Sequence, residues 1–445
     1  MKISFAFAAA LLAVTPMLPN QALAHPVLMV SFDGLRPGDV VDGKTRGLTL
    51  PHFSEALAKG SYSIGVRNVL PTITYPNHTT LITGVWPAIH GIDANTTFDP
   101  LRKNFEGWYW YFSDIKVPTL WSAVRDKGGN VASLGWPVSV GAPINENIPE
   151  YWRANTPDDM KLERVLSSPG LAARLERETG LSVGDVLQNT PQGDTNKAVW
   201  VARIMADFKP DFVTMHLSAV DEQQHTFGPG SAEAHAAIEN ADAALGVMED
   251  AARTVHPDEV VVLVSDHGFA PITHEVHITN AFVEAGLVTL DDKHRITSWD
   301  AMPWITGGSS AIMLARPNDA ALRAKVAALL QKLAADPASG VLRMADEAEI
   351  ARLGGGRGVS FWVDYKIGYL PSGALAGPLV TDGASVRGSH GYFPEHAEMH
   401  STFLIEGPGI PAGKNLGEID MRDIAPTVAR VLEVSLPTAQ GKPLF

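Results

Sequence analysis

Several short stretches of this chain are almost wholly apolar, which is the pattern of strands that are covered on both faces. The first is Val27–Phe32, and residues 131–136, 211–217 and 259–265 repeat the pattern further along the chain. Such runs are typical of the inner strands of a parallel sheet, because helices pack on both of its faces. A further strand is expected at residues 401–405.

Segments with helical spacing lie between these runs. Residues 50–59, 118–127, 232–254 and 421–432 carry apolar positions three or four residues apart, and Gly60 ends the first of them. Alternating strands and helices predict an α/β fold with a central, mostly parallel sheet and helices on both faces. Residues 137–195 are rich in Pro, Asn and Glu, and we interpret them as a surface excursion around the site.

The pattern changes between residues 291 and 387. Continuous apolar runs are fewer, Gly turns are frequent, and residues 322–333 form an amphipathic helix with Asn318 or Asp319 as its N-cap. We interpret this segment as an inserted smaller subdomain. The flanking residues 25–290 and 388–445 then form one catalytic core.

The first 24 residues have the features of a secretory signal peptide. Lys2 is followed by an apolar segment, and Ala22-Leu23-Ala24 is a small-residue cleavage site. We therefore expect an exported protein, periplasmic or extracellular, that begins near His25. No later apolar run is long enough to cross a bilayer, so no stable membrane insertion is expected.

Composition narrows the chemistry. The chain is 45% hydrophobic and 19% charged, with a formal net charge of -14, which argues against a protein that binds a nucleic-acid backbone over a broad surface. Cysteine is absent, so disulfides, thiolate metal sites and a cysteine nucleophile are excluded. A metal ion would have to bind to histidine and carboxylate side chains.

Acidic, hydroxyl and imidazole side chains follow the predicted strands. Each has an ordinary explanation on its own, as a turn residue, a helix cap or a surface histidine. Since the carboxyl ends of parallel strands meet at one edge of a sheet, we expect the set to converge there. Oxygen and imidazole ligands favour Zn²⁺ over Mg²⁺ or Mn²⁺. The set is Asp33, Thr74, Asp221, His225, Asp266, His267 and His390.

Longer motifs around these residues carry a resemblance. In chain order they are VSFDGLRP, PTITYPNHTTLITGVWPAIHGI, VDEQQHTFGP, VSDHGF and SHGYFPEHAEM. With them the chain resembles the type I phosphodiesterase and nucleotide pyrophosphatase family of the alkaline phosphatase superfamily. The resemblance implies an alkaline-phosphatase-like fold and two divalent metal ions, with Zn²⁺ preferred.

The resemblance also implies roles for single residues. Asp33, Thr74, Asp266 and His267 would hold one ion, and Asp221, His225 and His390 the other. Thr74 would be the nucleophile and form a covalent phospho-threonine. Asn95 would bind a phosphoryl oxygen, together with backbone N–H groups after Thr74, and Tyr75 would stack on a nucleobase.

Three functions other than phosphodiesterase are considered, and the residues of the chain argue against some of them. A sulfatase would need a modified Cys or Ser in a motif that this chain lacks. A phosphomonoesterase would need a cation for the second phosphate charge, and Lys116 has no paired Arg beside it. The third is a non-catalytic metal-binding export protein. We expect small phosphodiesters such as nucleotides as substrates, with lysophospholipid head groups as the other option and with Trp108, Tyr109, Trp110 and Tyr151 as further aromatic candidates.

Overall fold

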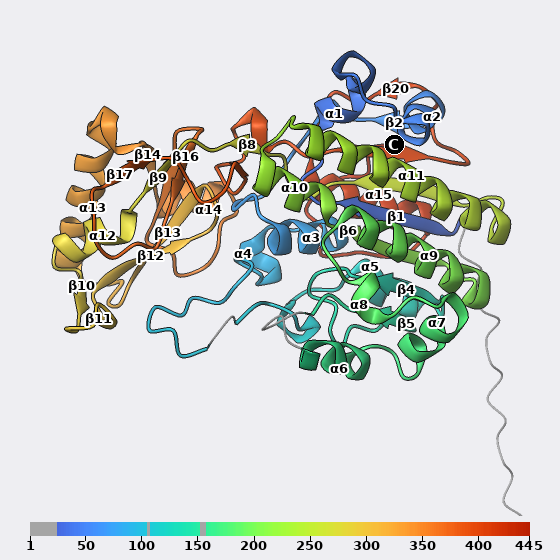
Figure 1. Cartoon of the computed structure of the whole chain (residues 1–445), viewed down its shortest axis with the longest axis horizontal. Helices are drawn as coiled ribbons and strands as arrows, with labels where there is room; N and C mark the ends of the chain where they lie inside the picture. Colours follow the sequence, from blue (N-terminus) through green and yellow to red (C-terminus); the bar gives the residue numbers. More distant parts are fainter. Residues whose placement is uncertain (1–24, 105–106, 152–156) are drawn as a thin grey trace, which may run out of the picture.

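The computed structural model describes residues 25–104, 107–151 and 157–445, so the predicted signal peptide at 1–24 lies outside the described part. The chain forms a large lobe and a smaller lobe side by side (Figure 1). The large lobe is built around an eight-stranded sheet. The smaller lobe comes from the middle of the C-terminal half of the chain, coloured yellow to orange.

The large sheet is mixed but mostly parallel. Neighbouring strands pair in parallel from β7 through β1, β6 and β4 to β5, whereas β19 is antiparallel to both of its neighbours. This confirms the predicted α/β fold with a central, mostly parallel sheet. The order across the sheet is β20 (Lys414–Asn415), β2 (Ser61–Tyr62), β19 (Phe403–Glu406), β7 (Val260–Val264), β1 (Val27–Phe32), β6 (Phe212–Leu217), β4 (Val131–Leu134) and β5 (Glu146–Ile148).

Both faces of β1 are buried, as the continuous apolar run predicts. Leu28, Val30 and Phe32 point into one core and Val27 and Met29 into the other, because successive side chains of a strand alternate between faces. The first core is closed by α2 (Pro51–Lys59), α7 (Leu171–Thr179), α9 (Pro191–Phe208) and α11 (Ala232–Val255). The second is closed by α3 (Thr74–Thr83), α5 (Leu120–Asp126) and α15 (Ile424–Val431).

The excursion predicted at residues 137–195 is more than a surface feature. It contains α6 (Pro157–Leu166), α7, α8 (Val183–Val186) and the start of α9. Leu175, Val183 and Val186 are fully buried in the first core. The interpretation as a surface segment is therefore wrong for these helices, since their apolar faces form part of the core.

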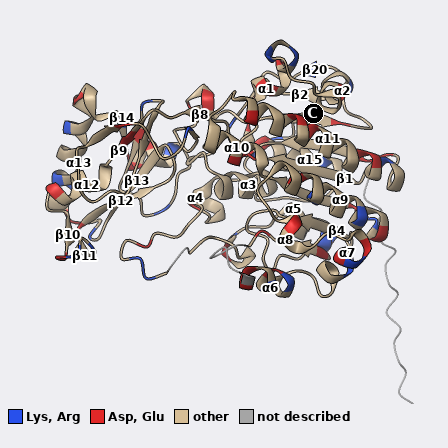
Figure 2. Cartoon of the chain, viewed as in Figure 1, with Lys and Arg blue, Asp and Glu red and all other residues tan. Residues whose placement is uncertain are grey.

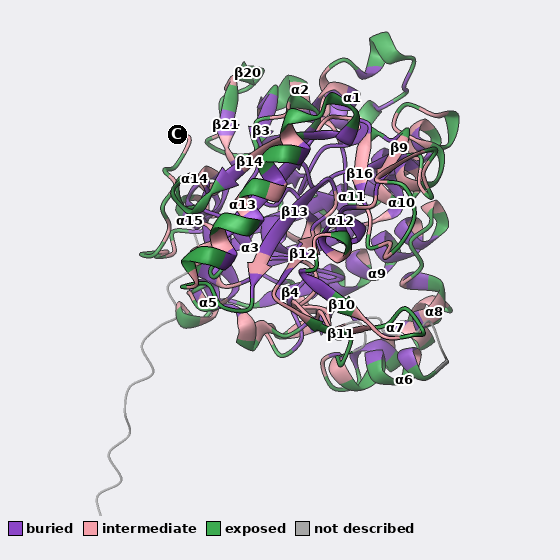
Figure 3. Cartoon of the chain, turned by 90° about the vertical axis from the view of Figure 1, so that its left-hand side faces the viewer, coloured by how far each residue is buried: buried purple, intermediate pink, exposed green. Residues whose placement is uncertain are grey.

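The smaller lobe has its own core. A four-stranded antiparallel sheet runs in the order β12 (Ala301–Ile305), β13 (Ser309–Leu314), β15 (Phe361–Tyr365) and β14 (Val341–Asp346). The predicted amphipathic helix is α13 (Ala320–Ala335), capped by Asp319, and its outer face is exposed over the buried strand β13 (Figure 3). The buried runs of β13 and β15 did not enter the prediction.

The remaining elements of the smaller lobe begin earlier than residue 291. A second, three-stranded sheet runs in the order β16 (Tyr369–Pro371), β9 (His274–Val276) and β17 (Val380–Asp382). This sheet and the helix α12 (Ile278–Glu284) pack into the same hydrophobic cluster as the four-stranded sheet of this lobe. A hairpin of β10 (Val288–Leu290) and β11 (Ile296–Trp299), with α14 (Glu347–Arg352), completes this lobe. The boundaries 291–387 stay a prediction, and this packing favours an earlier start.

Acidic and basic residues are interspersed along the elements of both lobes (Figure 2). A search of the described residues finds no helix with the length and apolar character that a membrane crossing needs.

Candidate active site

The sequence-predicted ligands do converge at the carboxyl edge of the large sheet. Asp33 directly follows β1, Asp266 lies two residues beyond β7, and Asp221 and His225 lie on α10 (Ala219–Phe227), which follows β6. Thr74 is the first residue of α3. A cavity of about 1070 Å³ opens over this edge, and its lining includes Asp33, Thr74, Asn95, Asp221, His225 and His390.

Asp33, Asp266 and His267 form one buried cluster, in which one ligand atom from each residue lies within 4.8 Å of the others. Each carboxylate is held by one oxygen. His216 Nε2 lies 3.0 Å from Asp33 Oδ2, and the Gly34 N–H donates to Asp266 Oδ1 at 3.1 Å. The other oxygens, Asp33 Oδ1 and Asp266 Oδ2, are buried and make no hydrogen bond, and they lie 3.3 and 3.1 Å from His267 Nε2.

Thr74 lies against this cluster. Its Oγ1 is 3.5 Å from His267 Nε2, at the limit of a hydrogen bond. The chain is extended at Ile73 and becomes helical at Thr74, and the Thr74 side chain lines the cavity at this N-terminus. The residues of α3 that follow Thr74 are buried. Thr74, which the resemblance implies as the nucleophile, therefore lies beside the residues that it implies as metal ligands.

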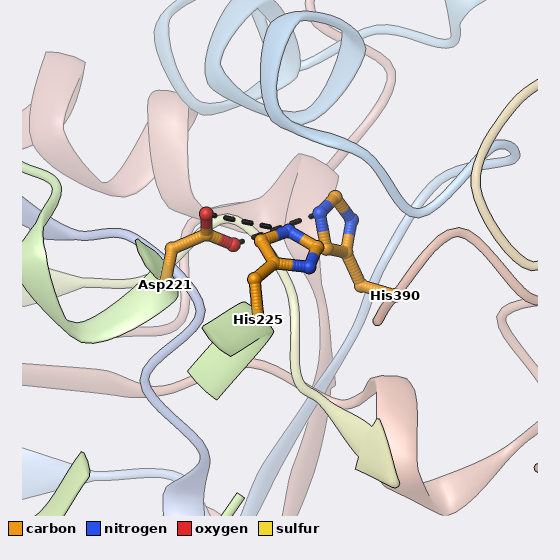
Figure 4. A group of neighbouring side chains, drawn as sticks. All are labelled: Asp221, His225 and His390. Atoms are coloured by element: carbon orange, nitrogen blue, oxygen red, sulfur yellow. Dashed lines mark ion pairs between the residues drawn. The ribbon is translucent and has the colours of Figure 1, made fainter. Parts of the chain in front are cut away.

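Asp221, His225 and His390 form the second cluster (Figure 4). Asp221 Oδ2 lies 3.4 Å from His225 Nε2, and Asp221 Oδ1 lies 3.6 Å from His390 Nε2. The spacing of four residues puts Asp221 and His225 on one face of α10. The His390 and His267 rings stack at 3.5 Å with an interplanar angle of 7°, so the two clusters are adjacent.

The three histidines share one arrangement. His225 Nδ1 lies 2.9 Å from the Gly388 carbonyl, His267 Nδ1 lies 3.1 Å from that of Gly268, and His390 Nδ1 lies 3.2 Å from that of Thr72. A carbonyl only accepts, so each Nδ1 carries a proton, and in the neutral ring Nε2 keeps its lone pair. This tautomer is the one that metal-ligating histidines adopt. With the unpaired carboxylate oxygens, the donor set fits two divalent cations of the Zn²⁺ type.

The pKa of Asp33 also agrees with a cation site. Burial, followed by the nearby charges of Asp266 and Asp221, raises the pKa of the Asp33 carboxyl well above its ordinary value. Carboxylates crowd together at such a cost where a cation is there to balance them.

The Asn95 side chain, from a later loop, lies next to the N-terminus of α3. The Tyr75 N–H donates to Asn95 Oδ1 at 2.9 Å, which leaves the Asn95 amide nitrogen as the donor. Residue 76 is proline and has no N–H. The backbone donors expected after Thr74 are therefore not free at the first two positions. The N–H of residue 75 already donates to Asn95, and residue 76 has no N–H.

Tyr75 is fully buried. Its ring centroid lies 5.2 Å from that of Trp108, and its hydroxyl donates to Glu150 Oε1 at 2.8 Å. Stacking of Tyr75 on a base stays a prediction, and in this conformation the half-buried Trp108 ring contacts the Tyr75 ring at an interplanar angle of 57°. Among the other aromatic candidates Tyr151 also lines the cavity, whereas Tyr109 and Trp110 do not.

Comparison with known proteins agrees with this geometry. A family model described as type I phosphodiesterase / nucleotide pyrophosphatase matches residues 27–380. The chain belongs to this family. Its curated relatives include human ectonucleotide pyrophosphatase/phosphodiesterase family member 1, which is 28% identical over 265 residues, covering 57% of this chain and 24% of the relative. Venom phosphodiesterase of Macrovipera lebetinus is 26% identical over 272 residues, covering 57% and 27%. The chain thus matches about a quarter of the length of these relatives.

Solved structures of the family share the fold. Human ectonucleotide pyrophosphatase/phosphodiesterase 5 aligns with a TM-score of 0.65 at 19% identity, covering 94% of this chain and 97% of that chain. The murine protein aligns with a TM-score of 0.66 at 20% identity and the same coverage, in an inactive threonine-to-alanine form in complex with AMP.

The structure adds site residues that sequence reasoning missed. His216, inside β6, bridges Asp33 and Glu150, with its Nδ1 2.9 Å from Glu150 Oε2. Burial alone lowers the pKa of His216, but hydrogen bonds to the two carboxylates outweigh it and raise the pKa to about 10. A histidine inside an otherwise apolar strand was the available signal.

Asp194 and Lys197 on α9 were also missed. The Asp194 carboxylate accepts from the backbone N–H groups of Ser218 and Ala219, at 3.1 and 2.9 Å, and so holds the start of α10. The Lys197 ammonium donates to Asp194 Oδ1 at 3.1 Å and to Ser218 Oγ at 2.8 Å. This buried pair positions the helix that carries Asp221 and His225.

The smaller lobe contacts His390, a candidate ligand of the second cluster. The Gly308 N–H, in the turn between β12 and β13, donates to the His390 carbonyl at 2.7 Å. A side chain at Gly307 would bring a Cβ atom to 2.4 Å from that carbonyl oxygen, so only glycine allows this approach. His390 is therefore held between the two lobes.

Proposed function

We propose that the protein is an exported, metal-dependent phosphodiesterase or nucleotide pyrophosphatase with Thr74 as its nucleophile. The observation that carries the proposal is the arrangement around Thr74 Oγ1. Two adjacent clusters of carboxylate and imidazole side chains lie there, and Asp33, Asp221, His225 and His390 from these clusters line one cavity with Thr74.

Asp33, Thr74, Asp266 and His267 would hold one cation, and Asp221, His225 and His390 the other. When bound, such cations supply Lewis-acid charge at the phosphoryl oxygens and make the threonine hydroxyl a better nucleophile at neutral pH. The same set, with the tautomers described above, supports Zn²⁺ as the ion.

The residues of the chain then act in two steps. The Thr74 hydroxyl proton passes to solvent, Oγ1 bonds to phosphorus, and the bond to the leaving-group oxygen breaks, after which that oxygen takes up a proton from solvent. The Asn95 amide donates to a phosphoryl oxygen during this attack. Water then attacks the phospho-threonine, which releases the phosphorylated product and restores the hydroxyl.

The cavity supports a diester substrate over a monoester. A phosphomonoester carries a second negative charge, which needs a free cation at the site. Lys197 is the sole Lys or Arg among the described lining residues, and its ammonium already contacts Asp194 and Ser218. Lys116, considered from the sequence, does not line the cavity and donates to the Ser113 carbonyl instead.

Nucleotides are the substrate class that we propose. The murine structural neighbour binds AMP in its inactive threonine-to-alanine form, and the curated relatives are named for nucleotide and phosphodiester cleavage. The volume of about 1070 Å³ leaves room for a second substituent beside the phosphoryl group. Export rests on the N-terminal sequence and on the word "ectonucleotide" in the relatives' names.

The deciding experiment compares a chromogenic phosphodiester with the matching phosphomonoester on Zn²⁺-loaded protein. We expect the diester to be the better substrate and Thr74→Ala to abolish its turnover. Thr79→Ala is the matched control, because Thr79 lies on the same helix and bonds back to the Tyr75 carbonyl at 2.8 Å, outside the cavity lining. This control should keep most of the activity.

Three other results would change the proposal. A clear preference for the monoester would make the protein a phosphomonoesterase. Full activity in Thr74→Ala would remove the nucleophile. Binding of Zn²⁺ without hydrolysis of either ester would favour a non-catalytic metal-binding protein.

A further inference from the structure

His216 is the only described residue whose two ring nitrogens both face carboxylates at the site. Its Nε2 lies 3.0 Å from Asp33 Oδ2 and its Nδ1 lies 2.9 Å from Glu150 Oε2, and 3% of its side chain is exposed. The ring therefore spans the two carboxyl groups, one at each nitrogen. The β6 backbone fixes its position, since His216 is paired with Ser31 of β1.

The contact with Asp33 decides which of its oxygens is available. Asp33 Oδ2 is taken by His216, whereas Oδ1 is buried and has no hydrogen-bond partner. A carboxylate with one oxygen held has little freedom to rotate. Oδ1 is therefore presented toward Asp266 and His267 before any ion binds.

Glu150 holds the other side of the ring. One of its oxygens faces His216 Nδ1, and the other accepts the Tyr75 hydroxyl at 2.8 Å. Tyr75 follows Thr74 in the chain, so these bonds connect the segment after β5, the β6 strand and the start of α3. Glu150 does not contact Asp33 in this arrangement, and its effect on Asp33 has to pass through His216.

We propose that His216 and Glu150 are positioning residues that orient Asp33 for the first metal ion, with Glu150 acting through His216. This inference rests on the proposed function, since it assumes that Asp33 is a ligand. Groups that hydrogen-bond to metal ligands typically change metal affinity or activity by about 10- to 100-fold when they are removed.

The test measures Zn²⁺ affinity directly, by competition with a chromogenic chelator. We expect His216→Leu to weaken one of two Zn²⁺ sites by about 10- to 100-fold and to leave the second site close to its wild-type affinity. Glu150→Gln keeps an oxygen that accepts from His216, so it should weaken the site less than Glu150→Ala. His216→Gln, which can donate to one carboxylate, should lie between wild type and His216→Leu.

A double variant tests whether Glu150 acts through His216. If it does, His216→Leu with Glu150→Ala binds Zn²⁺ no more weakly than His216→Leu alone, because coupled residues are non-additive. The kinetics should follow, with kcat falling in His216→Leu and KM for a diester changing much less.

His396→Gln is the matched control. His396 Nε2 also contacts a buried carboxylate, Asp364, at 3.0 Å, but this pair touches none of the proposed ligands. It should change thermal stability without changing Zn²⁺ affinity.

Unchanged Zn²⁺ affinity in His216→Leu, with only a lower melting temperature, would overturn the inference. Full additivity in the double variant would overturn the part assigned to Glu150. Failure of the proposed function is a separate result, in which the wild-type protein itself binds no Zn²⁺ or cleaves no phosphate ester.

Discussion

Asn95 offers a sharp test of the site, because its two polar atoms have different tasks. Oδ1 accepts the Tyr75 N–H at 2.9 Å, and a backbone N–H can only donate, so the orientation of the amide is fixed. In the proposed mechanism, the amide nitrogen is then the group that donates to the substrate. Asn95→Ala removes both functions, whereas Asn95→Asp keeps the acceptor and replaces the donor with a negative charge.

The magnitudes follow from these contacts. Loss of one pre-oriented donor to a developing oxyanion typically costs about 10²- to 10³-fold in kcat, or about 2.7–4 kcal/mol. In Asn95→Asp a carboxylate oxygen would face the phosphoryl oxygens, and two like charges at 4 Å repel by up to about 4 kcal/mol at an effective dielectric constant of 20. Cations at the site would screen part of this repulsion, so Asn95→Asp should fall below Asn95→Ala by less than that amount.

The thermal stability of the two variants should rank in the opposite order to their activity, with Asn95→Asp the more stable. Asn95→Ala leaves the Tyr75 N–H without its acceptor, at a cost of about 1 kcal/mol, whereas Asn95→Asp retains it. Steady-state kinetics on a chromogenic diester, together with thermal melts of the same Zn²⁺-loaded samples, measure both quantities. The reasoning is refuted if Asn95→Asp is the more active variant, or if Asn95→Ala keeps an activity close to that of the wild type.

Three further predictions follow from other parts of the structure. Elemental analysis should find two metal ions per chain, and chelation should remove ions, activity and thermal stability together, because Asp33 and its neighbouring carboxylates lose their counter-charge; active protein without metal would contradict this. Glu259 is buried with both oxygens unpaired, and burial followed by the charge of Asp258 raises its pKa to about 8, against 4.5 for an ordinary Glu. The native state therefore retains a proton that the unfolded chain loses, and stability falls as pH rises from about 4.5 to about 8, by at most about 5 kcal/mol at 1.36 kcal/mol per pKa unit. Glu259→Gln should thus raise the melting temperature more at pH 8 than at pH 5, and an equal gain at both would count against the titration. Trp108→Ala should raise KM about tenfold for a nucleotide diester and little for an aliphatic diester, as expected when stacking on a base is lost; an equal rise for both would argue against stacking.

Much of the site could be predicted from local sequence, because each metal-ligand candidate follows a strand or lies in a short motif. The apolar run Val27–Phe32 gives β1 with its bounds, and Asp33 follows from it. The pairing Asp221–His225 also shows in the sequence as a spacing of four residues on one helix.

The supporting residues could not be predicted, because their partners are distant in sequence. His216 meets Asp33 across 183 residues and Glu150 across 66. No local pattern encodes such pairs, since they depend on which strands become neighbours in the sheet. The burial of α7 and α8 was missed for a similar reason, because α7 is polar overall, α8 has only four residues, and only the fold shows where their apolar residues point.

The contacts between the smaller lobe and His390 limit which truncations and which exchanges of segments this protein can tolerate. The contacts of Gly307 and Gly308 with the His390 carbonyl make the turn between β12 and β13 part of the framework of the second cluster. A chimaera that exchanges the smaller lobe for that of a relative would have to keep this turn. The lobe is therefore not a detachable module, and variation between family members should concentrate on its outer surface, around α13, rather than on this junction.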